Sequence, residues 1–252
     1  MSMAAEDKED RSVATLERAL AILGTFEISP SQSLADLSRR TGLYKSTLLR
    51  LLGTLEKFGY IGQQDDGSYH IGVAALHLGS LYQRWIKPAE LINPALRALV
   101  EETGESSSFN VQEGDLRVCV YRVDSPHKIR DHVRVGDLLP LRRGAAGKVL
   151  LAFGQERDDP AWNGLRADCF CFTKGEIEPD TAAIAAPVFA AGGVLEGVLA
   201  ITGPAFRFSD DKVESMRLPL LRAALALSRD FGGRTEVLEA AVHRAQQAVP
   251  AA

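Results

Sequence analysis

The sequence lacks several features that mark particular classes of protein. It has no apolar run near the roughly 20 residues that a membrane-spanning helix needs. Its three cysteines, Cys119, Cys169 and Cys171, are an odd number and give no disulfide framework. The five histidines show no metal-ligand spacing, and residues 1–12 are too polar for a secretory signal. We therefore expect a cytoplasmic protein with no metal, no cofactor and no membrane partner, and a disordered tail at residues 1–10.

An excess of positive charge is also absent. Lys and Arg number 29 against 33 Asp and Glu, which gives a net charge of −4. This balance excludes a protein that coats nucleic acid by charge alone. Between Arg11 and Arg84, however, eight basic residues outnumber six acidic ones. Modest affinity for phosphates, reinforced by the geometry of a dimer, is the expectation for this part of the chain.

Two short helices separated by a glycine turn are predicted between residues 33 and 58. Ser33 and Asp36 form a capping-box pattern, with Asp in place of the usual Glu. Thr41-Gly42 ends that helix, because glycine accepts the left-handed conformation of a helix C-terminus. The next helix, residues 44–58, places four leucines on one face: Leu48, Leu51, Leu52 and Leu55. This stripe is expected to pack on the preceding helices.

An amphipathic helix precedes this pair, and a hairpin follows it. Residues 13–26 repeat apolar side chains at helical spacing, and Ser29-Pro30-Ser31 ends the helix. Strands at 60–61 and 69–71 flank Asp65-Asp66-Gly67, a sequence typical of tight turns. This order of elements predicts a winged helix-turn-helix over residues 11–72.

The face of the third helix opposite the leucine stripe is polar near the helix start, where such helices contact bases. Arg50 can donate two hydrogen bonds to guanine, and Lys45 can reach a phosphate or a base. The predicted DNA-binding residues are Arg39, Arg40, Tyr44, Lys45, Ser46, Thr47 and Arg50. A solvated helix face is the alternative, but the whole combination of elements favours double-stranded DNA as a partner.

The second half of the chain has a different pattern. Strands are predicted at 118–123, 131–135, 184–189 and 194–202, and Gly192-Gly193 joins the last two as a hairpin. Helices are predicted at 73–85, 91–103, 145–153, 209–229 and 235–248. Strands with helices at both ends indicate an α+β domain of the sensor type, which begins near Lys87-Pro88.

Several motifs together resemble the IclR family of bacterial transcriptional regulators. They are LERALAIL (16–23), LADLSRRTGLYKSTLLRLL (34–52), Gly59-Tyr60, Asp66-Gly67, YHIG (69–72), VGDLLPL (135–141), GAAGKVLLA (144–152), IAAPVF (184–189) and ITGP (201–204). The resemblance implies a winged helix-turn-helix at 11–72, a linker helix at 73–87 and a GAF-like effector domain at 88–252, whose antiparallel sheet is flanked by helices. It also implies homodimers or homotetramers on a palindromic operator.

Two departures from the family pattern bear on function. Family members often carry arginines in the wing, where this chain has Gly62, Gln63 and Gln64. Contact between the wing and the minor groove is therefore not expected. The segment between Ala152 and Ile184 is shorter than in most members, so part of the outer layer of the effector domain should be trimmed.

The resemblance also implies a pocket for a small organic effector. The matching positions are Ala145, Ala146, Thr173, Ala183, Ala200 and Thr202, and Arg134 and Arg142 could add positive charge. Amides at the start of the helix at 145–153 suit a carboxylate. Alanine at positions that are polar in relatives favours a larger, partly apolar acid. Plain core packing is the alternative for the alanines, and a solvated loop or a salt bridge between subunits is the alternative for the arginines.

Enzymatic signatures are absent. Residues 142–149 do not form a phosphate loop, because Arg142 replaces the first glycine and Val149 follows Lys148. No nucleophile is paired with a base. The prediction is a sequence-specific DNA-binding regulator, repressor or activator, whose second domain binds a small effector. The alternatives are an enzyme that uses the winged helix as an interaction module, and a constitutive DNA-binding protein.

Overall fold

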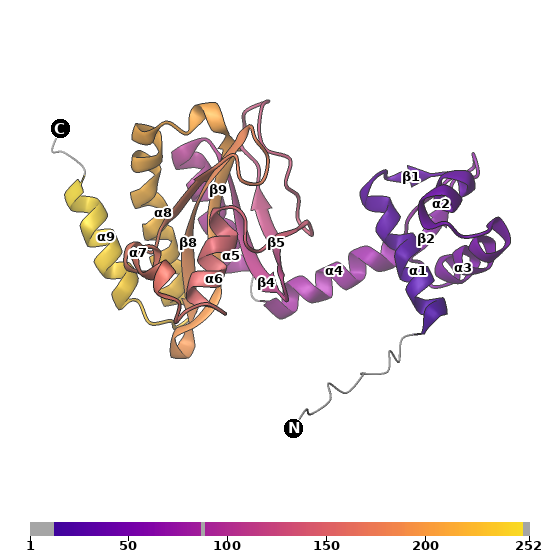
Figure 1. Cartoon of the computed structure of the whole chain (residues 1–252), viewed down its shortest axis with the longest axis horizontal. Helices are drawn as coiled ribbons and strands as arrows, with labels where there is room; N and C mark the ends of the chain where they lie inside the picture. The colour runs from indigo at the N-terminus through magenta and orange to yellow at the C-terminus, as the bar shows by residue number, and fades with distance from the viewer. Residues whose placement is uncertain (1–12, 87–88, 249–252) are drawn as a thin grey trace, which may run out of the picture. The chain divides into compact units, whose positions relative to one another are not determined.

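A computed structural model describes residues 13–86 and 89–248 of the chain (Figure 1). The chain divides into two compact units, Met1–Ile86 and Lys87–Ala252. The expected tail at residues 1–10 and the expected boundary at Lys87-Pro88 lie outside the described residues. None of the helices within the described ranges has the length and apolar character to cross a membrane.

The first unit contains a helix-turn-helix followed by a hairpin and a long helix. Its elements are α1 (Ala14–Gly24), the 3-10 helix η1 (Thr25–Glu27), β1 (Ser31–Gln32), α2 (Leu34–Thr41), α3 (Lys45–Lys57), β2 (Ile61–Gln63), β3 (Tyr69–Ile71) and α4 (Val73–Ile86). The helix-turn-helix and the hairpin lie where the sequence predicts them. Ile22, Leu37, Leu48 and Leu52 are buried together in the core of this unit.

Local hydrogen bonds explain why α2 begins and ends where it does. Ser33 Oγ accepts from the amide of Asp36, and the Asp36 carboxylate accepts from the amide of Ser33, which confirms the predicted capping box. At the other end Gly42 has φ 69°, a left-handed conformation that glycine adopts without steric cost. The capping box and Gly42 therefore set the two ends of α2, which has eight residues, and the chain continues from Gly42 to α3.

The sheet of the first unit has three strands rather than the two expected. β1 pairs antiparallel with β3, so the strand order is β1-β3-β2. Gln32 on β1 is buried, and its side-chain amide donates to the carbonyl of Thr25 at 2.8 Å. A strand of two polar residues has no period that a sequence pattern can detect.

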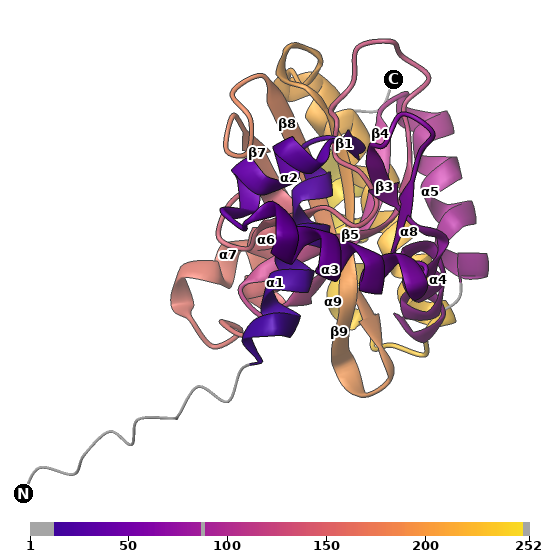
Figure 2. The same cartoon turned by 90° about the vertical axis from the view of Figure 1, so that its right-hand side faces the viewer.

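The second unit is an antiparallel sheet with helices on both faces. Its elements are α5 (Ala89–Thr103), β4 (Ser106–Glu113), β5 (Leu116–Val123), β6 (Leu138–Pro140), α6 (Ala145–Phe153), η2 (Pro160–Trp162), α7 (Asn163–Asp168), β7 (Cys171–Lys174), β8 (Thr181–Ala190), η3 (Ala191–Gly193), β9 (Val194–Pro204), η4 (Ala205–Arg207), α8 (Asp210–Asp230) and α9 (Glu236–Ala248). The strand order is β6-β5-β4-β9-β8-β7. Figures 1 and 2 show α6 on one face of the sheet and α5 and α8 on the other. The predicted α+β class is therefore confirmed.

The strand expected at 131–135 is wrong. These residues form a loop, and the edge strand is β6, which pairs with β5 through Leu139 and Arg117. The loop is held by side chains instead: the Asp131 carboxylate accepts from Arg122, and Asp137 accepts from the amide of Arg134. Polar and apolar residues alternate over 132–135, and this pattern is also typical of a strand.

Two strands of this sheet, β4 and β7, were not expected. β4 is rich in polar residues, yet Ser106, Ser107, Ser108 and Asn110 are all buried. Some of their hydrogen bonds go to partners outside the strand: Ser107 Oγ donates to the carbonyl of Leu96 at 2.7 Å, and Ser106 Oγ accepts from the amide of Ser125 at 3.0 Å. A polar strand at the centre of a sheet is stabilised in part by hydrogen bonds to residues of other elements, so the sequence of the strand alone does not predict it.

Candidate functional site

Helix α3 presents one free face to solvent. Its leucines Leu48, Leu51 and Leu52 are buried against the other helices. Lys45, Ser46, Leu49 and Arg50 are exposed on the opposite side, with Leu49 at 52% exposure. Tyr44, the residue before the helix, is 85% exposed. A recognition helix needs such a face, because every exposed side chain near its start can meet a base edge.

The remaining predicted DNA-binding residues lie around this face. Thr47 is half-buried in the first turn of α3, and Arg40 is exposed at the end of α2. Arg39 pairs with Asp36 of the same helix, so part of its charge is already balanced. All seven predicted residues thus belong to α2, α3 and the turn between them.

The wing carries carboxylates and no basic residue between Ile61 and His70. Asp66 accepts from the amide of Ser68 at the tip, and hydrogen bonding to the side chain and to the amide of Ser68 lowers the pKa of Asp66. Gln63 donates to the carbonyl of Gly67 across the hairpin. An ionised tip repels phosphate, so the charge of this wing opposes close approach to DNA.

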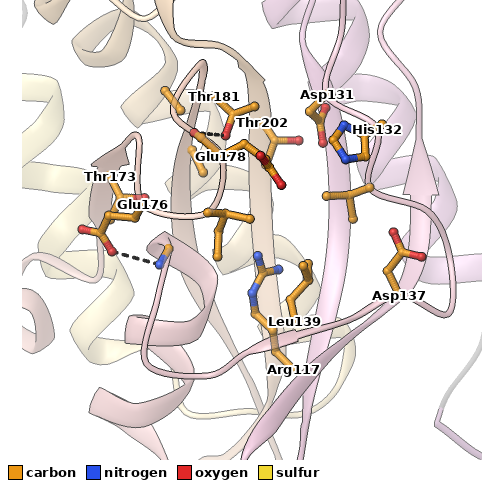
Figure 3. A pocket seen from close by; sticks show the side chains of 15 residues that line it. Arg117, Asp131, His132, Asp137, Leu139, Thr173, Glu176, Glu178, Thr181 and Thr202 are labelled. Atoms are coloured by element: carbon orange, nitrogen blue, oxygen red, sulfur yellow. Dashed lines mark hydrogen bonds between the residues drawn. The ribbon is translucent and has the colours of Figure 1, made fainter. Parts of the chain in front are cut away.

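The second unit contains a cavity of about 90 Å³ between one face of the sheet, Gly144 at the start of α6, and two loops (Figure 3). Segments far apart in the sequence supply its walls. The lining residues are Arg117 of β5, Asp131, His132, Val133 and Asp137 of the loop before β6, Leu139 of β6, Gly144, Thr173 of β7, Glu176, Ile177 and Glu178 of the loop before β8, Thr181, Ala182 and Ala183 of β8, and Thr202 of β9.

Arg117 is the buried cation of this cavity. It is 7% exposed, and Figure 3 shows its guanidinium pointing into the cavity. Nη1 donates to the side-chain oxygen of Asn110 at 2.9 Å, whereas Nε has no hydrogen-bond partner within the described ranges. Burial lowers the pKa of Arg117 to about 10, so the group stays protonated at neutral pH.

The carboxylates around Arg117 are engaged elsewhere or stand apart from it. Asp131 pairs with Arg122 at 2.8 Å, and Asp137 accepts from a backbone amide. Glu178 points into the cavity from the opposite wall (Figure 3). No carboxylate among the described residues forms an ion pair with Arg117. A buried charge without a counter-ion is costly, so this geometry favours the entry of an anion.

Glu176 occupies the start of α6. One carboxylate oxygen accepts from the amide of Gly144 at 3.0 Å, and the other pairs with Lys148 at 2.5 Å. Burial opposes ionisation of this group, but the hydrogen bonds from Lys148 and Gly144 outweigh burial and lower the pKa of Glu176. The chain therefore already places a carboxylate of its own on the amide just before the helix where an effector was expected.

The structure separates the eight residues predicted for an effector into three groups. Thr173, Ala183 and Thr202 line the cavity. Ala145, Ala146 and Ala200 are buried in the apolar cluster beneath α6. Arg134 and Arg142 are exposed and are not lining residues, and Arg142 pairs with Glu156 at 2.7 Å.

Sequence reasoning missed Arg117. Its signal was present: Arg117 stands two and four residues before Cys119 and Tyr121, so it shares a face with them in a strand. A charged residue on an inward face of an otherwise apolar strand indicates either a buried pair or a binding site.

Comparison with known proteins relates both units to one family. The family model of the IclR helix-turn-helix domain matches residues 15–65, and that of the bacterial transcriptional regulator IclR C-terminal domain matches residues 86–163 and 160–229. The HTH-type transcriptional regulator BhcR of Paracoccus denitrificans (strain Pd 1222) is 28% identical over 260 residues, which cover 93% of this chain and 93% of the relative.

Two solved structures share the fold. Thermotoga maritima IclR has a TM-score of 0.72 at 22% identity and covers 87% of this chain and 99% of its own. An IclR homologue from Microbacterium hydrocarbonoxydans, complexed with 4-hydroxybenzoate, has a TM-score of 0.70 at 22% identity and covers 86% of this chain and 99% of its own. At these identities the likeness concerns the fold alone.

Proposed function

Because the chain belongs to the IclR family of bacterial transcriptional regulators, we propose that a small organic acid binds beside Arg117 and controls binding of the chain to a palindromic operator. We assign residues 11–72 to DNA reading, 73–87 to the linker and 88–252 to effector binding and oligomerisation. The observation that carries the effector proposal is the buried guanidinium of Arg117, which donates to Asn110 and forms no ion pair with any of the described residues.

The exposed face of α3, formed by Lys45, Ser46, Leu49 and Arg50 and called here the reading face, supports the DNA part of the proposal. Arg50 is exposed near the middle of this face, one residue from Leu49 and one turn from Ser46. A guanidinium there can donate two parallel hydrogen bonds to guanine, whereas Lys45, at the helix start, is suited to a phosphate. Specificity rests on α3 because the wing has no basic side chain.

Arg50→Ala is expected to weaken operator binding by roughly 1–3 kcal/mol and to relax the preference at one base pair. The measurement is an electrophoretic mobility shift with the operator and with single-base variants. Lys57→Ala is the matched control, because Lys57 is also an exposed cation but lies at the far end of α3. If Arg50→Ala binds the operator with unchanged affinity and unchanged base preference, Arg50 does not contact the bases.

Charge and surroundings support a carboxylate as the effector. The hydroxyls of Thr173 and Thr202 line the cavity near Arg117 and can donate to an acid. Glu176 already caps α6, so the guanidinium is the cation left for an incoming anion. The homologue from Microbacterium hydrocarbonoxydans was crystallised with an aromatic carboxylate, 4-hydroxybenzoate.

Arg117→Gln tests the effector site. The wild-type protein is expected to melt at a higher temperature with some members of a panel of short-chain and aromatic carboxylates, because binding stabilises the folded state. Arg117→Gln should lose this shift, since a neutral amide does not pair with the acid. Arg142→Gln is the matched control, because Arg142 is exposed and paired with Glu156. An equal shift in wild type and Arg117→Gln would refute the assignment.

Effector and operator binding are expected to be coupled reciprocally. If the acid changes operator affinity by a given factor, the operator changes acid affinity by the same factor. Operator binding that is insensitive to every acid that binds the cavity would favour a constitutive DNA-binding protein.

Oligomerisation is the third part of the proposal. Leu16 and Leu20 on α1 and Leu76 on α4 are exposed, Leu76 at 74%. Exposed apolar faces on a soluble protein mark interaction surfaces. We assign these faces to contact with a second copy of the chain, because a palindrome has two equivalent half-sites.

A further inference from the structure

We propose that the effector is an elongated acid whose apolar tail lies in a second groove outside the Arg117 cavity. This inference rests on the proposed effector site and adds the chemical class of the ligand. The groove has a volume of about 710 Å³ and opens beside the cavity.

The groove and the cavity adjoin each other. Asp131, His132, Glu178 and Thr181 line both of them. In Figure 3 Asp131 and His132 stand on one side and Glu178 and Thr181 on the other, so these four residues form the boundary between the two spaces. In the proposed complex a molecule held by Arg117 extends across this boundary into the groove.

Size argues that a ligand uses both spaces. Ligand sites commonly have volumes of about 300–1,000 Å³. The cavity alone, at about 90 Å³, has room for a carboxylate and a few further atoms. The groove, at about 710 Å³, supplies the remaining volume.

Large apolar side chains form part of the groove walls. Phe206 and Ile129 are 72% and 64% exposed, and both line the groove, with Pro179, Pro204 and Ala205 beside them. Large apolar side chains left exposed around a hollow indicate a surface that is covered when a ligand binds. A phenyl or alkyl tail suits these walls.

Arg207 holds the two apolar walls in place. Its guanidinium forms a two-point ion pair with the buried carboxylate of Glu105, at 2.5 and 2.7 Å, and donates to the carbonyl of Ile129 at 3.0 Å. It also lies 5.5 Å from the centre of the Phe206 ring. The groove is thus preformed, which lowers the ordering cost of binding.

The charges of the groove do not select a charged tail. Arg130 and Lys174 line it together with three carboxylates, Asp131, Glu178 and Asp180, and Asp131 is already paired with Arg122 at 2.8 Å. Arg130 is moreover paired with Asp124 at 3.4 Å. A neutral tail is the occupant that this balance favours.

The test compares acids that share a carboxylate and differ in the tail: acetate, benzoate and 4-phenylbutyrate, titrated calorimetrically into the full chain. We expect 4-phenylbutyrate to bind at least about tenfold more tightly than acetate, because burial of the phenyl group adds apolar contact. Phe206→Ser should lower the affinity for 4-phenylbutyrate by about tenfold and leave the affinity for acetate unchanged. Phe206→Leu should retain most of the affinity, since it keeps an apolar wall.

Phe58→Ser is the matched control, because Phe58 is an equally exposed phenylalanine of the first unit. Equal affinities for the three acids, or a Phe206→Ser variant that weakens acetate as much as 4-phenylbutyrate, would overturn the tail site while the Arg117 site stands. Binding that survives Arg117→Gln would instead overturn the proposed effector site, and binding of none of the acids to wild type would overturn both.

Discussion

Burial sets the protonation state of several side chains in the second unit. Burial raises the pKa of Cys119 and Cys169 to about 12 and that of the half-buried Cys171 to about 11. The same effect lowers the pKa of Arg117 to about 10. In each case a low-dielectric surrounding disfavours the charged form. The thiols are therefore neutral at physiological pH, whereas the guanidinium stays charged.

The cysteines are expected to react slowly in the folded protein. A pKa of about 11 for Cys171, raised from 9.0, reduces its thiolate fraction at pH 8 by about 100-fold, and only the thiolate is nucleophilic. Reaction with a disulfide reagent such as DTNB, followed by absorbance, should therefore be slow until urea unfolds the chain. The unfolded chain should then release three equivalents of the coloured thiolate from the reagent, one for each cysteine. Rapid reaction of one thiol in the folded state would contradict the burial described here.

Helix α2 shows how an element is delimited by its ends. Its capping box holds the first turn, and Gly42 closes the last one. The hydrogen bonds from Ser33 lower the pKa of Asp36. A carboxylate whose pKa is lowered on folding stabilises the fold above its ordinary pKa of 3.8, and this contribution is lost as the pH falls below that value.

Ser33→Ala is expected to destabilise the first unit by roughly 1 kcal/mol, because the amide of Asp36 loses its acceptor. The measurement is differential scanning calorimetry of the full chain, in which the transition of the first unit should move to lower temperature. Ser46→Ala, which removes an exposed hydroxyl from the first turn of α3, should leave that transition unchanged. The difference between the two variants should shrink as the pH falls below 3.8, because Asp36 then becomes protonated. If Ser33→Ala and Ser46→Ala have the same melting temperature at neutral pH, the cap contributes nothing to the stability of the first unit.

For the whole molecule, the proposed function connects subunit association with DNA binding through the apolar faces of α1 and α4. Leu16 and Leu20 follow each other at helical spacing on α1, and Leu76 is exposed on α4. A protein with a net charge of −4 gains little affinity for DNA from charge alone. Two reading helices on one operator add their contacts, so association is the route to useful affinity.

Leu16→Asp combined with Leu76→Asp is expected to reduce the mass in solution to half or less and to abolish operator binding at concentrations that saturate wild type. The reason is that a carboxylate in an apolar interface carries a desolvation cost. Light scattering coupled to size exclusion measures the mass, and a mobility shift measures operator binding. Ile28→Asp is the matched control, because Ile28 is exposed outside α1 and α4. An unchanged mass in the double variant would place the subunit contact elsewhere.

The sequence by itself determined the helix-turn-helix, the hairpin and most helices of the second unit. The signals for these elements, such as the Ser33–Asp36 box and the leucine spacing of α3, are complete within a few residues of each other. Local hydrogen bonds and one-sided packing follow directly from such spacing.

Only the tertiary structure decided where the cavity lies and what lines it. Arg117 and Thr202 are far apart in the chain and meet because the sheet has the order β6-β5-β4-β9-β8-β7. The same packing buries the serines of β4 and turns Arg134 and Arg142 outward. The physical reason is that burial and pairing across the sheet depend on which strands become neighbours, and no local pattern encodes that choice.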